Sequence, residues 1–263
     1  MADGGVHFDP EVTVPNPARV YDYWLGGSSN FAVDRELGDR MIAIDSRVVP
    51  MVRENRHFLR RVVTWLCRNG VTQFLDLGSG IPTVGNVHEV AARVTPEAKV
   101  AYVDSEPVAV AYSARILEGN QNATITHADL RDAETVLSAP TVAGLLDFSR
   151  PVAVLALSVL QYFGDLENPA AMLDRYRKVL VPGSYFAISH ISADDSDVDM
   201  DGLADATKQA TVSAHPRTRA EVTALFGDAQ LVPPGLVWVG GWHAEPGSAE
   251  PVPGILGGLG RVG

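Results

Sequence analysis

The sequence predicts an α/β protein in which helices cover both faces of a mostly parallel β-sheet. From Gln73 onward, short apolar runs alternate with longer amphipathic segments, which is typical of βαβ units. The run Val152–Leu157 is apolar at every position, as in a parallel strand covered on both faces. In the stretch Phe74–Gly80, Phe-Leu-Asp-Leu-Gly-Ser-Gly, a buried strand turns tightly into a helix.

The composition limits the possible partners. The chain has 263 residues, 46% of them hydrophobic, which suits one large domain with an appendage. The formal net charge is −11, whereas a nucleic-acid groove or an anionic membrane needs clustered cations, so neither is expected as a partner. Cys67 is the sole cysteine, which excludes an internal disulfide and a thiolate metal cluster. The longest apolar run, Val152–Leu160, is too short to span a bilayer, and no signal peptide is apparent; we expect a cytoplasmic protein.

Three helices are expected before the first strand. Residues 16–25 form the first, with Asn16 as its N-cap and a proline in its first turn. Residues 34–44 form the second. Residues 51–68 form the third, in which apolar side chains recur every three or four positions. We interpret residues 1–60 as an N-terminal helical extension that covers the site.

Seven strands and four further helices are expected after residue 70, with a short fifth helix at residues 203–212. The strands are predicted at residues 73–77, 99–103, 124–127, 152–157, 185–189, 231–232 and 236–239. The helices are predicted at residues 86–94, 107–119, 170–180 and 218–226. We take residues 61–245 as the main domain. Within it, the acidic segment 192–215 is predicted to be a lid insertion, and the glycine- and proline-rich residues 246–263 a flexible tail.

Three consecutive predicted strands end in an acid: Asp76, Asp104 and Asp129. A single acid after a strand is commonly a turn residue. Because parallel strands share one carboxyl edge, these three carboxylates should lie together, next to the Gly-x-Gly turn. Carboxylates accept hydrogen bonds from a ribose diol or an amino group and favour a cation. The dinucleotide fingerprint is incomplete, since Thr83 stands where the third glycine belongs.

At these positions the sequence resembles the class I S-adenosylmethionine-dependent methyltransferases. The motifs are Asp-x-Gly-x-Gly at 76–80, the acid at 104, Ala-Asp-Leu at 128–130 and Leu-Val-Pro-Gly-Ser at 180–184. More closely, the chain resembles an actinobacterial methyltransferase-like family formerly described as a domain of unknown function. That resemblance rests on residues 16–23, 53–56, 85–89 and 234–237. It implies a Rossmann-like three-layer sandwich whose last strand is antiparallel, and S-adenosyl-L-methionine as the cofactor.

The resemblance also implies a set of cofactor contacts. On the methionyl side, Asp76 would orient the ammonium group, and Gly78, Ser79 and Gly80 would let the backbone reach the cofactor. Ser158, just past the fourth strand, would line the methyl-donor side.

On the nucleoside side, Asp104 would accept from the ribose hydroxyls, with Ser105 beside the adenine. Asp129 would accept from the adenine amino group, and the Leu130 amide would meet the ring.

The methionyl carboxylate needs a cation, which the strand-end acids cannot supply. The third helix leads directly into the first strand and should run back along it, so Arg53 and Arg56 should reach the cofactor edge. A guanidinium matches a carboxylate in two-point contact. Tyr21 and Tyr23 would close the site from above. If the acceptor requires a base, the candidates are His190, at the end of the fifth strand, and Tyr21.

The sequence does not identify the methyl acceptor. No Asn-Pro-Pro-Tyr motif follows the fourth strand, which disfavours methylation of nucleic-acid amines, so we expect a small-molecule acceptor. Two alternatives stay open. One is a binding module for S-adenosylmethionine without catalysis, and the other is an NAD-dependent oxidoreductase, which the missing third glycine disfavours.

Overall fold

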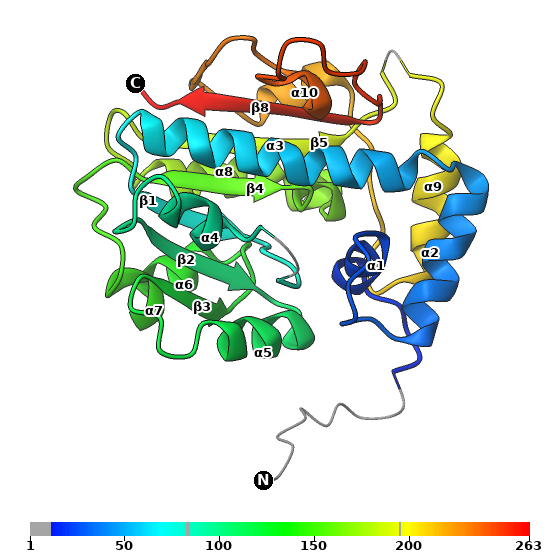
Figure 1. The fold of residues 1–263 in the computed structure, drawn as a ribbon, viewed down its shortest axis with the longest axis horizontal. Coiled ribbons are helices and arrows are strands. Elements are labelled where there is room, and N and C mark those ends of the chain that lie inside the picture. Colours follow the sequence, from blue (N-terminus) through cyan, green and yellow to red (C-terminus); the bar gives the residue numbers. More distant parts are fainter. Residues whose placement is uncertain (1–11, 83–84, 195) are drawn as a thin grey trace, which may run out of the picture.

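A computed structural model of the chain describes residues 12–82, 85–194 and 196–263. They form one mixed sheet (Figure 1), made of β1 (Gln73–Leu77), β2 (Lys99–Asp104), β3 (Ala123–His127), β4 (Ala153–Leu157), β5 (Tyr185–Ile191), β6 (Gln230–Leu231), β7 (Val237–Trp238) and β8 (Ile255–Arg261). The strand order is β3-β2-β1-β4-β5-β8-β6, and β7 also pairs with β8. The strands β1 to β5 are parallel, and β8 is antiparallel to its three neighbours. The predicted α/β class is confirmed, with eight strands in place of seven.

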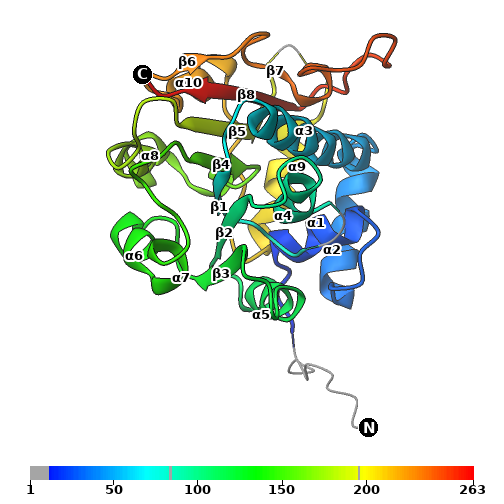
Figure 2. The same ribbon diagram turned by 60° about the vertical axis from the view of Figure 1, so that its left-hand side comes forward.

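Helices form the two outer layers (Figure 2). One face carries α3 (Val48–Arg68), α4 (Val87–Ala92) and α5 (Pro107–Ile116), and the other carries α6 (Ala133–Ser138), α7 (Pro140–Ala143), α8 (Pro169–Arg177) and α10 (Arg219–Ala224). Successive side chains of a strand point to opposite faces. In β1, Phe74 accordingly joins the buried cluster that contains Leu66 of α3, and Leu75 joins the one that contains Tyr176 of α8. In the described part of the chain, no helix is both long and apolar enough to cross a bilayer.

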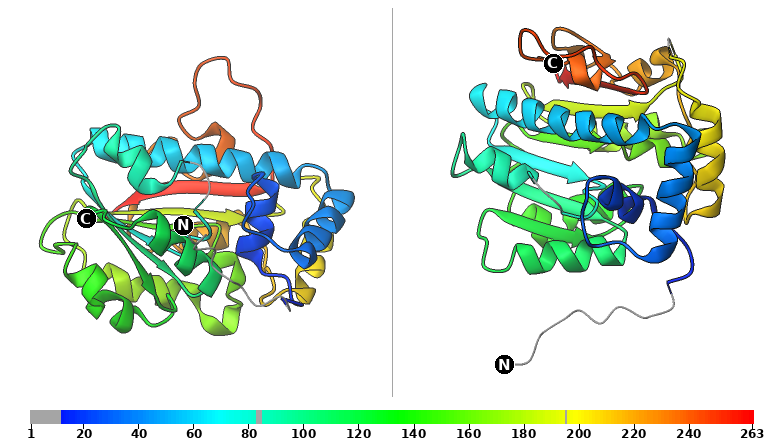
Figure 3. Two further views of the ribbon diagram at one scale, coloured as in Figure 1. Left: turned by 60° about the horizontal axis from the view of Figure 1, so that its bottom comes forward. Right: turned by 45° about the vertical axis from the view of Figure 1, so that its right-hand side comes forward.

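A group of helices lies beyond the carboxyl ends of the parallel strands. It consists of α1 (Pro17–Trp24), α2 (Ala32–Ile44) and α9 (Met200–Ala206), and α2 packs against both others (Figure 3). The Asn16 side chain accepts from the Ala18 amide at 2.8 Å, so the predicted N-cap is confirmed. Short 3₁₀ helices complete the list: η1 (Leu160–Tyr162), η2 (Asp165–Glu167), η3 (Thr207–Gln209) and η4 (Val239–Gly241).

The predicted lid, residues 192–215, contains α9 and η3. Asp197, Asp201 and Asp205 are exposed, but Met200 and Leu203 are buried against the N-terminal helices. Arg47, ahead of α3, also pairs with Asp197. The segment therefore forms part of the wall around the site, and its mobility without ligand stays a prediction.

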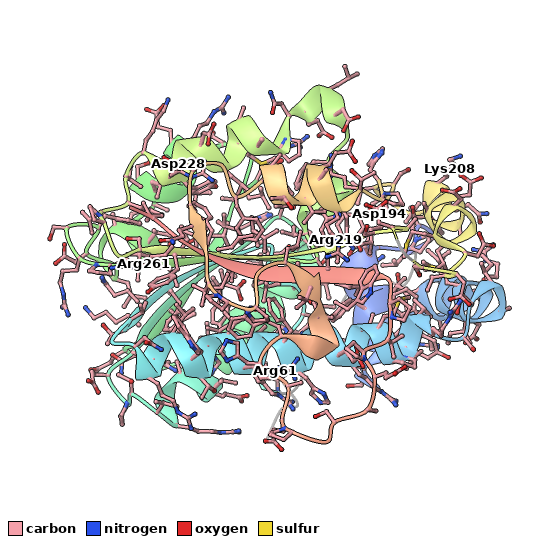
Figure 4. All side chains as sticks on the ribbon, turned by 90° about the horizontal axis from the view of Figure 1, so that it is seen from above. Arg61, Asp194, Lys208, Arg219, Asp228 and Arg261 are labelled. Carbon is pink, nitrogen blue, oxygen red and sulfur yellow. The ribbon has the colours of Figure 1, made fainter. Side chains whose placement is uncertain are left out.

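The prediction of a flexible tail is wrong for residues 255–261, which form β8. This strand lies between β5 and β6 and is buried along almost its whole length. The segment that precedes β8 is held by Arg61 of α3 (Figure 4). Its guanidinium donates to the carbonyls of Trp242 at 2.6 Å and Val239 at 2.7 Å. The predicted boundary after residue 60 falls inside α3, which is continuous, so the N-terminal extension and the main domain share one helix.

Candidate functional site

A cavity of about 230 Å³ opens at the carboxyl ends of β1, β2, β3 and β4. Its walls include every predicted cofactor contact except Arg53, namely Tyr21, Arg56, Asp76, Gly78, Ser79, Gly80, Asp104, Ser105, Asp129, Leu130 and Ser158. The structure thus brings together residues from α1, α3 and the carboxyl ends of the four strands β1 to β4. We call it the first cavity.

The turn after β1 forms the floor of the first cavity. Gly78 and Gly80 have φ of 68° and 66°, a conformation that side chains other than glycine rarely adopt. At Gly78 a Cβ would lie 2.3 Å from Cγ2 of Val159, whereas around the Cβ position of Gly80 there is nothing within 4 Å. Gly78 is therefore required for packing, and Gly80 leaves room above the backbone for a ligand.

Asp104 fixes this turn from the end of β2. Its Oδ2 accepts from the Gly80 amide at 2.7 Å, and its Oδ1 accepts from the Glu106 amide at 2.8 Å. Burial raises the pKa of the Asp104 carboxyl, and these backbone hydrogen bonds act in the opposite direction. Each carboxylate oxygen retains a lone pair for a donor in the cavity.

Asp76 lines the first cavity and is buried, with 6% of its surface exposed. Burial raises the pKa of Asp76 to about 7; Arg56 acts against the shift, and Asp104 adds to it. Within the described residues its carboxylate forms no hydrogen bond. Such a group favours a ligand that brings a donor or a positive charge.

Asp129 is placed differently from the other two acids. Its side chain is 39% exposed, and both carboxylate oxygens are engaged by the guanidinium of Arg131. This contact holds the pKa of Asp129 below its usual range. A ligand amino group at this end of the cavity would share the carboxylate with Arg131.

Three buried polar atoms around the first cavity have no hydrogen-bond partner in the described part of the chain. They are Oδ1 of Asn55, Nε of Arg56 and Oγ of Ser79. Buried polar atoms in native proteins are nearly always paired, so unpaired ones lining a cavity indicate a missing ligand or water. Two acceptor-capable oxygens beside a guanidinium suit a ligand that carries both an ammonium and a carboxylate group.

Asn55 connects the N-terminal helices to the end of β4. Its Nδ2 donates to the Tyr21 hydroxyl and to Oγ of Ser158, both at 3.0 Å. Ser158 has φ of 52°, a strained conformation for serine. Strain of this kind is common at functional sites, where the surrounding contacts impose it. Asn55 thus links Tyr21 of α1 to Ser158 at the edge of the cavity.

The prediction for Arg53 is wrong in geometry. Arg53 is exposed and does not line the cavity, whereas Arg56 lies in its wall with the guanidinium 5.8 Å from the Tyr21 ring centroid. Residues two apart on a helix point in nearly opposite directions. Because Asn55 faces the cavity, Arg53 faces away from it.

The prediction of His190 as a base is also wrong. β5 extends to Ile191, two residues beyond its predicted end, so His190 is inside the strand and fully buried. Arg217 Nη1 donates to His190 Nε2 at 2.8 Å, which leaves Nδ1 to donate to the Ile191 carbonyl at 2.8 Å. Burial lowers the pKa of His190 to about 4. It is a neutral structural residue outside the cavity.

The low pKa of His190 makes folding stability depend on pH. The unfolded chain protonates this histidine near its ordinary pKa, whereas the folded chain does so only near pH 4, so stability is lost as pH falls through this window. Relative to His190→Gln, wild type should lose about 2 kcal/mol of unfolding free energy between about pH 7.5 and pH 5. Urea unfolding of both proteins at several pH values measures this loss. If the difference in unfolding free energy between them does not change with pH, His190 is not neutral in the folded protein.

An ionic cluster that the sequence did not predict ties α1 to the site. Arg19 Nε donates to Asp34 at 2.8 Å, and its Nη1 donates to Glu106 at 2.7 Å. All three side chains are at most 9% exposed. Glu106 also caps α5 through the Ala109 amide and follows Asp104 closely in the chain. Arg19 lies in a motif of the resemblance, but no local pattern indicates a partner 87 residues away.

A second, smaller cavity of about 70 Å³ adjoins the first. The two share Pro17, Tyr21, Ser158 and Tyr162. The other walls of this second cavity come mainly from apolar side chains of α1, α2, α3 and α9.

Comparison with curated proteins finds no match. A model of the S-adenosyl methyltransferase family matches residues 8–263. Among solved structures, a candidate methyltransferase from Thermobifida fusca is 35% identical, with a TM-score of 0.91 over 98% of this chain and 99% of that chain. A DUF574 family protein from Streptomyces avermitilis is 31% identical, with a TM-score of 0.90 over 94% of this chain and 97% of that chain.

More distant structures share the fold alone. The plantazolicin methyltransferase BpumL, solved with S-adenosylhomocysteine, is 15% identical, with a TM-score of 0.51 over 93% of this chain and 94% of that chain. The chain belongs to the S-adenosyl methyltransferase family, whose cofactor is S-adenosylmethionine.

Proposed function

We propose that the protein transfers a methyl group from S-adenosylmethionine to a small-molecule acceptor, with the cofactor held in the first cavity. The observation that carries the proposal is the set of unpaired groups there: the carboxylate of Asp76 and the buried polar atoms of Asn55, Arg56 and Ser79. Together they match the ammonium and carboxylate of the methionyl moiety. The open space above Gly80 supports the same placement.

Each side chain then has a defined part. Arg56 holds the methionyl carboxylate, and Asp76 with Asn55 Oδ1 accepts from the ammonium group. Asp104, already fixed by the Gly80 amide, accepts from the ribose hydroxyls. Charge-assisted hydrogen bonds of this kind stabilise a complex by roughly 1.5–3 kcal/mol each.

Methyl transfer requires little acid–base chemistry from the protein. Bound S-adenosylmethionine supplies a methyl group on a sulfonium, which is a good leaving group. The residues around the cavity align the reactants and exclude water. Effective molarities indicate that such effects lower an activation barrier by roughly 7–11 kcal/mol. Tyr21, held by Asn55 at 3.0 Å, closes the cavity toward the N-terminal helices.

Arg56→Ala tests the assignment of the methionyl carboxylate. We expect it to weaken S-adenosylmethionine by roughly 1.5–3 kcal/mol and to leave decarboxylated S-adenosylmethionine nearly unaffected. Isothermal titration calorimetry with both ligands measures the difference. Arg53→Ala, on the exposed side of the same helix, is the matched control and should change neither affinity. Equal losses for both ligands in Arg56→Ala would refute this role.

A further inference from the structure

We propose that the second cavity is the acceptor site, and that it takes a small, uncharged, mainly apolar molecule whose nucleophile is a neutral nitrogen or a thiol. This inference rests on the proposed function, because it takes the first cavity as the cofactor site. It adds the chemical class of the acceptor.

The second cavity lies next to the first, where an acceptor would have to bind. It meets the first cavity at Tyr21, Ser158 and Tyr162, so an atom of a molecule bound there can reach the space of the first. Ser158 lies directly past the end of β4, with its Oγ held by Asn55. The strained backbone of Ser158 is therefore located where the two cavities join, which is where the reacting atoms must meet.

The lining determines the chemical class. Most of its side chains are apolar and several are flexible methionines, including Met41, Met51 and Met200. Among the described residues around this cavity, none carries a charge. An anionic or cationic acceptor would lose its hydration without gaining a counter-ion, which costs several kcal/mol. Thioether side chains adapt to irregular apolar ligands.

The size restricts the acceptor further. A cavity of about 70 Å³ is smaller than the roughly 150 Å³ cavity that accepts benzene in an engineered protein core. A short chain or a single five-membered ring is therefore the largest occupant that the walls admit without moving. Its mouth toward the first cavity lets the reacting atom extend beyond this volume.

The second cavity also lacks a general base. The Tyr21 hydroxyl donates to the Val52 carbonyl at 3.3 Å and accepts from Asn55, so its proton is already engaged. Burial raises the pKa of Tyr21, and it raises the pKa of Tyr162 to about 12. Gln161 has no basic group. An aliphatic alcohol, which needs proton removal, is accordingly a poor acceptor here.

The transfer step balances with such a nucleophile. The lone pair of the acceptor atom forms a bond to the methyl carbon, while the carbon–sulfur bond breaks and its electron pair stays on sulfur. S-adenosylhomocysteine leaves as a neutral thioether, and the positive charge passes to the acceptor. A ring nitrogen keeps this charge, whereas a thiol sulfur releases its proton to water.

The test measures binding to the protein saturated with S-adenosylhomocysteine at neutral pH. The neutral probes are thiazole and propane-1-thiol, and the charged probes of similar size are propionate and propylammonium. Ligand-observed NMR should show at least tenfold tighter binding of the neutral probes. Transfer of a labelled methyl group from S-adenosylmethionine, followed by mass spectrometry, distinguishes nitrogen from sulfur as the nucleophile.

Two variants locate the site. Ala204→Phe and Ala210→Phe each place a ring in the second cavity and should weaken the neutral probes at least tenfold. Ala224→Phe, on the exposed side of α10, is the control. All three should bind S-adenosylhomocysteine as wild type does, which also shows that they fold. Unchanged probe affinity in both cavity variants, or a preference for the charged probes, would overturn the inference. Failure of the wild type to bind S-adenosylhomocysteine would overturn the proposed function instead.

Discussion

Asp76→Asn is expected to stabilise the ligand-free protein and, at the same time, to weaken cofactor binding. The pKa of Asp76 is raised to about 7, so the folded protein binds this proton more tightly than the unfolded chain. Stability is therefore lost as pH rises from about 4 to about 7 and stays lower above that range. Removing the charge should restore about 2–4 kcal/mol of unfolding free energy at about pH 8.

The same substitution removes an acceptor for the methionyl ammonium. We expect the affinity for S-adenosylmethionine to fall by roughly 1.5–3 kcal/mol, measured by calorimetry. Unfolding in urea at about pH 4 and pH 8 gives the stability difference, which should be small at the lower pH. Asp201→Asn, an exposed acid on α9, is the control and should change neither quantity. Loss of stability at high pH in Asp76→Asn would refute the buried-charge explanation.

Arg19→Met should cost about 3–5 kcal/mol of unfolding free energy, because it leaves two buried carboxylates, Asp34 and Glu106, without their cation. Chemical denaturation measures this loss. Arg40→Met, at an exposed position on α2, should be nearly neutral. Since Glu106 caps α5 beside Asp104, cofactor affinity should fall as well.

A combined variant separates the charge effect from lost packing. When Asp34→Asn and Glu106→Gln accompany Arg19→Met, no buried charge is left unpaired, and a large part of the stability should return. If the triple variant is no more stable than the single one, the loss comes from packing and the electrostatic account of the cluster is wrong.

Much of the sheet could be predicted because its strands have strong local patterns. The apolar run of β4 and the acid after β2 identify both elements from a few neighbouring residues. β8 could not be predicted, because its glycine-rich sequence resembles that of a flexible linker. They serve close packing instead: a Cβ on Gly257 would lie 2.7 Å from Val239, and one on Gly260 would lie 2.8 Å from the Phe226 ring.

Site residues could be predicted where a single strand end or turn determines their position. The strand-end acids and the glycines of the first turn could be placed because parallel strands share one carboxyl edge. Arg53 failed because the rotation of a helix decides between neighbouring arginines, and His190 failed because β5 is two residues longer than its pattern. The Arg19 cluster joins segments distant in the chain, which no local pattern reveals.

The place of β8 in the sheet has a consequence for synthesis. β8 is translated after every other strand, yet it lies between β5 and β6. While the ribosome still holds this segment, β5 presents an unpaired edge, and such edges promote aggregation. The nascent chain therefore cannot close its sheet until Ile255–Arg261 leaves the exit tunnel, and the β5 edge stays unpaired until then.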